Sequence, residues 1–81
     1  MRALTLQSSQ IANLAYDPDE ETLFIHFQSS GKWAKYDGVP GEVVLSILFD
    51  TVSHGRAFDA LVKSAEYPWK YVEQGEYGLH V

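Results

Sequence analysis

The chain has 81 residues and no cysteine, which leaves room for one domain and excludes disulfides, thiolate metal sites and thiol catalysis. Its apolar content of 46% and aromatic content of 14% are typical of a chain that folds around a core. The net charge of −5 opposes non-specific binding to nucleic acid, because such binding depends on Lys and Arg that neutralise phosphates.

Three antiparallel strands are predicted in the first half of the chain. Between them lie turn residues, Asp17 and Pro18 at the first turn and Gly31 at the second. The middle strand alternates clearly, with Leu23 and Ile25 on one face of the predicted sheet. The sequence therefore predicts a three-stranded meander, with strands at residues 11–17, 22–28 and 32–38.

Two helices are predicted to follow the meander. Pro40 suits a first helical turn, and the helix predicted at 40–52 has apolar residues at helical spacing up to Thr51 or Val52. Ser53 is a suitable N-cap for a second helix at 54–65. We expect both helices to cover one face of the sheet, with a core of Leu23, Ile25, Phe27, Val44, Leu48, Phe58 and Leu61.

An aromatic tail ends the chain. Tyr67, Trp69 and Tyr71 alternate as in a strand, and Pro68 would confine such a strand to an edge of the sheet. These three rings predict an association surface for a protein partner or a second copy of the chain. The alternative is a tail that folds back over its own sheet. The predicted organisation is a domain at residues 1–65 and an extension at 66–81.

One cluster has the residue types of a catalytic triad. Asp50, Ser53 and His54 supply the acid, the nucleophile and the base, but side chains so close in sequence rarely point at one another. We therefore predict no enzyme activity, no cofactor and no small-molecule substrate. The apolar runs are too short for a membrane span, and the chain is expected in the cytoplasm.

A second cluster has part of the spacing of a calcium-binding loop. Asp17, Asp19 and Glu21 occupy alternate positions. Thr22 stands where such a loop requires glycine, and Gln28 stands where it requires a bidentate glutamate. The sequence therefore predicts a solvated turn here and no metal site.

The third predicted strand carries the best candidate contacts for RNA. Lys32 and Lys35 could meet phosphates, and Trp33 and Tyr36 could stack on bases. Alternation places the two rings on opposite faces of the strand, and Asp37 follows at once. These four residues are therefore candidate RNA contacts, but they make a weak platform.

One set of strand, turn and cap residues carries a family resemblance: Ser9, Ile11, Tyr16, Asp17, Leu23, Phe27, Gly31, Tyr36, Gly38, Val39, Pro40, Ser53, Gly55 and Phe58. Their order resembles that of the KTSC domain. This is a short module at the C-terminus of some lysyl-tRNA synthetases that also occurs in stand-alone bacterial and phage proteins. The resemblance implies a small α+β domain without established activity, for which attachment to a synthetase suggests RNA binding.

This chain departs from the family at one motif. The family's central Tyr-x-Tyr appears here as Ala34-Lys35-Tyr36, so its first tyrosine is missing. Together with the negative net charge, this favours a non-catalytic module that binds a protein partner or itself. An RNA-binding accessory domain and a phage-type inhibitor of a host protein or nucleoprotein remain the alternatives.

Overall fold

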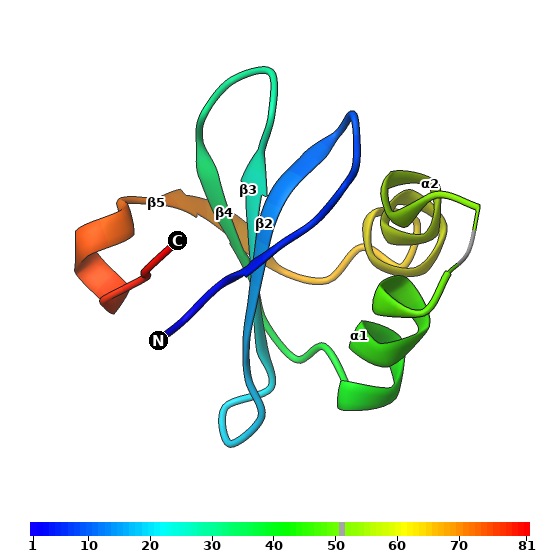
Figure 1. The fold of residues 1–81 in the computed structure, drawn as a ribbon. Helices are drawn as coiled ribbons and strands as arrows, with labels where there is room; N and C mark the ends of the chain where they lie inside the picture. Colours follow the sequence, from blue (N-terminus) through cyan, green and yellow to red (C-terminus); the bar gives the residue numbers. More distant parts are fainter. Residues whose placement is uncertain (51) are drawn as a thin grey trace.

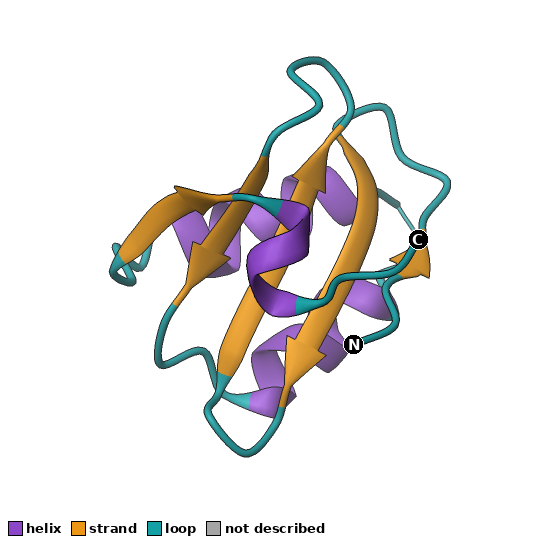
Figure 2. Ribbon diagram, turned by 90° about the vertical axis from the view of Figure 1, so that its left-hand side faces the viewer, coloured by secondary structure: helices purple, strands orange, loops and turns teal. Residues whose placement is uncertain are grey.

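A five-stranded antiparallel sheet forms the centre of the described part of the chain, residues 1–50 and 52–81 (Figure 1). The computed structural model orders the strands as they follow in sequence, β1-β2-β3-β4-β5. Their bounds are β1 Leu4–Thr5, β2 Ile11–Asp17, β3 Thr22–Phe27, β4 Trp33–Tyr36 and β5 Trp69–Val72. Helices cover one face of this sheet, which confirms the predicted α+β class (Figure 2).

The predicted three-stranded meander is confirmed at β2, β3 and β4, but as a description of the whole sheet it is too small. β1 was missed because two residues cannot display a period-two pattern. β5 pairs with β4 in a register that places Tyr36 opposite Trp69. The aromatic tail thus joins the sheet at its edge, and the pairing spans more than thirty residues of intervening chain, a contact that local patterns do not reveal.

The two predicted helices are present with shorter bounds. They are α1, Gly41–Leu48, and α2, His54–Phe58. Pro40 is the N-cap residue of α1, and the Ser53 hydroxyl caps α2 by accepting a hydrogen bond from the Arg56 N–H at 3.1 Å. The helical position predicted at Thr51 lies outside the described residues.

The main core lies between the helices and the sheet. Its buried members come from β2, β3, β4 and both helices: Ile11, Leu14, Leu23, Ile25, Ala34, Tyr36, Val39, Val44, Ile47, Ala57, Phe58 and Val62. The Phe58 ring contacts Tyr36 edge-on at 5.4 Å between ring centroids and Phe27 at 6.0 Å. Leu23, Ile25, Val44 and Phe58 therefore occupy the predicted core, whereas Phe27 and Leu48 lie at its margin, partly buried.

The predicted core position of Leu61 is wrong, because α2 continues into a π-helical turn, η1, Asp59–Lys63. Its wider turn is visible in the bond from the Ser64 N–H to the Asp59 carbonyl, which joins residues five apart. The wider spacing keeps Val62 on the same side as Phe58 but rotates Leu61 outward. Val62 is accordingly fully buried, and Leu61 is 38% exposed.

A second, smaller core covers the opposite face of the sheet. It consists of Ala3, Ala15, Phe24, Trp33, Val72 and Leu79, with Tyr77 packed against it. The 3₁₀ turn η2, Gln74–Tyr77, carries the end of the chain over this face (Figure 2). Gly78 then adopts a left-handed conformation with φ of 60°, and the Ala3 N–H donates to the His80 carbonyl at 2.7 Å. The tail therefore forms both a strand at the edge and a cover over the second face.

Candidate interaction surface

β5 is the last strand of the sheet within the described residues, and its outer side is unpaired. Hydrogen-bonded pairs alternate with non-bonded pairs along an antiparallel ladder. The Asp37 N–H donates to the Pro68 carbonyl at 2.9 Å, so the next bonded positions on β5 are Lys70 and Val72. The N–H and C=O groups of Trp69 and Tyr71 consequently point away from β4, toward the free side.

The rings of Trp69 and Tyr71 lie on the helix-covered face of the sheet, where Trp69 lines a pocket together with Val62 and Lys63 of η1. The two rings remain 53% and 55% exposed and contact each other edge-on at 5.0 Å between centroids. The Trp69 ring also stacks on Tyr36 at 6.0 Å, and the Lys32 ammonium lies 4.8 Å from the centre of the Tyr71 ring. These contacts hold both rings in place while each keeps about half its surface free.

Tyr67, the third ring of the predicted association surface, lies before β5. It is half-buried and packs against the main core. The surface formed by exposed rings is thus centred on Trp69 and Tyr71. We call these two residues, with the outer edge of β5, the β5 surface.

The four candidate RNA contacts do not form one exposed platform. Trp33 is only 4% exposed and belongs to the second core, where it stacks on His26 at 4.6 Å between centroids. Tyr36 is 3% exposed and lies in the main core. Lys35 pairs with Asp37, and Lys32 lies over Tyr71. A base has no free face of Trp33 or Tyr36 on which to stack, because other side chains already cover them.

Burial of Tyr36 has a measurable consequence. The pKa of Tyr36 is raised from 10.0 to about 12. The largest cause is the loss of water around the buried phenol, and the negative charges of ionised Tyr71 and of Asp59 add to it. Because the folded state favours the neutral phenol, Tyr36 stabilises the folded protein fully below pH 10, and this contribution is lost as the pH rises through about 12.

In an ultraviolet titration, we expect one tyrosine to ionise near pH 12 in the wild type, and we expect this step to be missing from Tyr36→Phe. Ionisation of all five tyrosines near pH 10 would contradict this burial.

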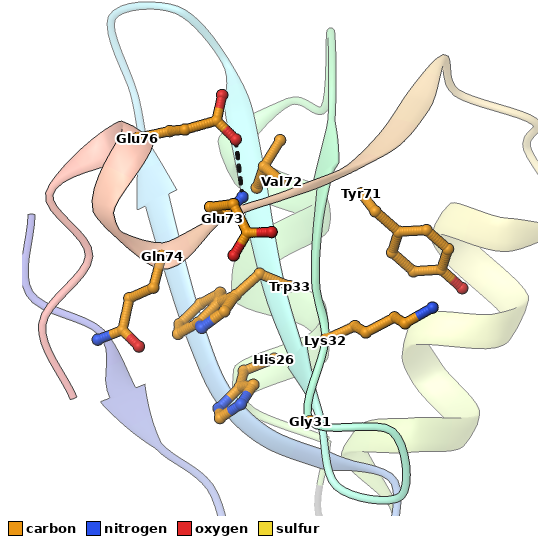
Figure 3. A pocket seen from close by; sticks show the side chains of 9 residues that line it. All are labelled: His26, Gly31, Lys32, Trp33, Tyr71, Val72, Glu73, Gln74 and Glu76. Carbon is orange, nitrogen blue, oxygen red and sulfur yellow. Dashed lines mark hydrogen bonds between the residues drawn. The ribbon is translucent and has the colours of Figure 1, made fainter.

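A pocket of about 430 Å³ lies on the second face, beside β5 (Figure 3). Figure 3 shows Trp33 and His26 at its base and Lys32 extended toward Tyr71. Its carboxylates are already engaged, because Glu73 and Glu76 form the capping box of η2, with the Glu73 N–H donating to Glu76 at 2.8 Å. The pocket therefore presents one ammonium group, that of Lys32, which lies over the Tyr71 ring.

The side chains with the residue types of a triad serve the helix termini. The Asp50 carboxylate accepts hydrogen bonds from the Ser53 and Val52 N–H groups at 2.8 and 2.9 Å, which lowers the pKa of Asp50. A ring nitrogen of His54 lies 2.8 Å from the Ile47 carbonyl. The three side chains do not form a hydrogen-bonded relay of the kind a triad requires.

In the acidic turn at 17–21, the Asp17 carboxylate binds main-chain N–H groups of the same turn. The Asp17 carboxylate accepts hydrogen bonds from the Asp19 and Glu20 N–H groups at 3.0 and 3.3 Å. Within residues 1–50 and 52–81, no three His, Asp or Glu side chains gather closely enough to hold a metal ion. No described helix is long and apolar enough to cross a membrane.

A second apolar surface was missed from the sequence. Leu45 and Phe49 lie four residues apart on the outer side of α1 and its C-cap, and Phe49 is 76% exposed. With Leu4 and Leu48, Leu45 borders a mainly apolar groove of about 380 Å³ between α1 and the edge of the sheet. The i,i+4 spacing is the signal that could have identified this face, but it was hidden by the stronger pattern of the buried side of α1.

Comparison with known proteins places these features in a family. The chain matches the KTSC domain over residues 7–67, and β5 lies just after the matched region. An uncharacterised protein of Stutzerimonas stutzeri strain A1501 is 40% identical over 67 residues, which are 83% of this chain and 92% of that relative. A crystal structure of a KTSC domain protein from Yersinia pestis has a TM-score of 0.80 at 31% identity, covering 88% of this chain and 96% of that one. The predicted resemblance is thus confirmed, and the protein belongs to the KTSC domain family.

Proposed function

We propose that this protein is a non-catalytic binding module that docks a protein partner, or a second copy of itself, on the β5 surface. One observation carries the proposal. Two large rings, Trp69 and Tyr71, are both about half exposed on a strand whose outer main-chain groups are unpaired.

Each part of this surface favours association. Trp and Tyr are enriched among the residues that contribute most to binding energy at interfaces, because a ring buries a large area while losing few rotatable bonds. An unpaired edge strand supplies directional hydrogen bonds to another extended chain. The contacts of Trp69 with Tyr36 and of Tyr71 with Lys32 reduce the mobility that binding would otherwise have to remove.

A protein partner fits the chain better than RNA does. The two rings predicted to stack on bases are buried, Tyr36 in the main core and Trp33 in the second core. The net charge of −5 also repels a phosphate backbone. These two observations support the protein-binding proposal over the RNA alternative.

The double substitution Trp69→Ser/Tyr71→Ser tests the proposal. Affinity capture from the source cell is compared for the wild type and the double variant, with and without nuclease, and sedimentation reports self-association. We expect specific proteins, or a second copy, to be bound by the wild type and lost from the variant, with no effect of nuclease. Loss of all partners on nuclease treatment would instead support the RNA alternative.

The control is a second double substitution to serine, made on the exposed apolar side chains of α1 and its C-cap. Leu45→Ser/Phe49→Ser removes two exposed apolar side chains outside the β5 surface. Both double variants should retain the fold, because all four altered side chains are more than half exposed. Equal loss of partners from the two variants, or retention by both, would contradict a role specific to the β5 surface.

A further inference from the structure

The middle of β5 carries a positive charge that has no carboxylate partner among the described residues. Lys70 lies between Trp69 and Tyr71 in the strand, so its side chain projects from the opposite face of the sheet. The ion pairs in the described part of the chain, Lys35–Asp37 and Lys63–Asp59, leave Lys70 without a carboxylate partner. Lys70 is also exposed, and the residue across the ladder from it is another cation, Lys35.

This charge acts against pairing of two identical edges. Antiparallel pairing that uses the free groups of both Trp69 and Tyr71 would set Trp69 of one copy opposite Tyr71 of the other. The two Lys70 side chains would then lie directly opposite each other, and like charges in that position destabilise a strand pair. Lysine on an edge strand is a known means of preventing self-pairing. Each copy also carries a net charge of −5, which adds long-range repulsion.

We infer that the occupant of the β5 surface is an extended segment of another protein, added antiparallel to β5, with an acidic residue beside Lys70 and an apolar residue on each side of it. This inference rests on the proposed function and adds the chemistry of the partner. The pattern follows from the register. Side chains alternate between faces, so residues opposite Trp69 and Tyr71 meet the two rings, and the residue between them meets Lys70.

The main-chain groups fit the same arrangement. In an added antiparallel strand, the residues opposite Trp69 and Tyr71 are the ones that exchange hydrogen bonds with β5, because those positions are unpaired. The acidic residue falls at the non-bonded position opposite Lys70, where facing side chains lie closest together. An apolar–acidic–apolar segment therefore satisfies the rings, the free main-chain groups and the unpaired ammonium at once.

A capped peptide with the central sequence Val-Glu-Val, flanked by Ser and Thr, is the probe for this inference. It is titrated into isotope-labelled full-length protein and followed by NMR. We expect the Trp69 and Tyr71 amide signals to shift most, and a Val-Lys-Val peptide to bind about two- to fivefold more weakly, the scale of an exposed ion pair. A peptide with both valines N-methylated should not bind, because it lacks the donors to β5.

Exchange of the charge on the protein provides the matched control. Lys70→Glu should reverse the ranking of the Val-Glu-Val and Val-Lys-Val peptides without altering the fold, since Lys70 is exposed. Absence of shifts at Trp69 and Tyr71, or an unchanged ranking in Lys70→Glu, would overturn the inference. Self-association of the wild type through the two rings would also overturn it.

The proposed function and this inference fail in different ways. If Trp69→Ser/Tyr71→Ser abolishes partner capture while no peptide binds, the surface is a docking site but not by acidic strand addition. If no peptide binds and Trp69→Ser/Tyr71→Ser retains all partners, the docking site itself is wrong.

Discussion

Phe58→Ala is expected to lower the free energy of unfolding by about 3–5 kcal/mol, the usual cost of emptying a fully buried aromatic site. Phe58 is completely buried and contacts Tyr36 and Phe27 edge-on, so its removal leaves a cavity where α2 meets the sheet. Domains of this size have a total stability of about 5–15 kcal/mol or less, so most of the margin is lost. Chemical denaturation monitored by circular dichroism measures the difference.

Phe49→Ala is the matched control, because it removes the same atoms from a side chain that is 76% exposed. Its stability should stay within about 0.5 kcal/mol of the wild type, as for most surface substitutions. Equal midpoints for Phe58→Ala and the wild type would show that the helices do not pack on the sheet through Phe58.

Ending the chain at Ala65 is expected to cost about 3–6 kcal/mol. The deletion removes Val72 and Leu79 from the second core, and full burial of each such side chain contributes about 1.5–3 kcal/mol. It also uncovers Trp33 and Phe24, which these residues shield together with Tyr77. Thermal unfolding should therefore begin at a much lower temperature. The fluorescence of Trp33, the tryptophan that remains once Trp69 is deleted, should be that of a solvent-exposed ring.

The control chain ends at His80. It loses only Val81, which is 70% exposed, and should unfold like the wild type. The predicted boundary between residues 65 and 66 depends on the outcome. An independent domain at 1–65 requires that the shorter chain stays folded with full stability, whereas the packing of the tail predicts that it does not. Because truncation changes stability, the β5 surface has to be tested by point substitutions.

The parts of the fold that were predictable from sequence depend on local patterns. The alternation of Leu23 and Ile25 identified the face that receives the helices, and Ser53 identified the start of α2. An extended segment confined to a sheet edge was also predictable at Trp69 and Tyr71 from alternation and Pro68, although its pairing with β4 was not.

What could not be predicted depends on contacts between distant segments. Trp33 projects from the face opposite the helices, and nothing in its own strand indicates that the last residues of the chain cover that face. It therefore had the pattern of an exposed stacking ring, although it is buried by Val72 and Leu79. The outward rotation of Leu61 was hidden for a related reason, since a π-helical turn has no signature in the apolar spacing.

Hydrogen bonds join the two ends of the chain, and this terminal clasp bears on the order of folding. The terminal amine of Met1 donates to the Gly78 carbonyl at 2.7 Å, and the His80 N–H donates to the Met1 carbonyl at 2.9 Å. These bonds close nearly the whole chain into one loop, and a longer loop costs more entropy to close than the short β2–β3 and β3–β4 hairpins. The hairpins therefore have the entropic advantage early in folding. The terminal clasp belongs among the last contacts to form and among the first to open.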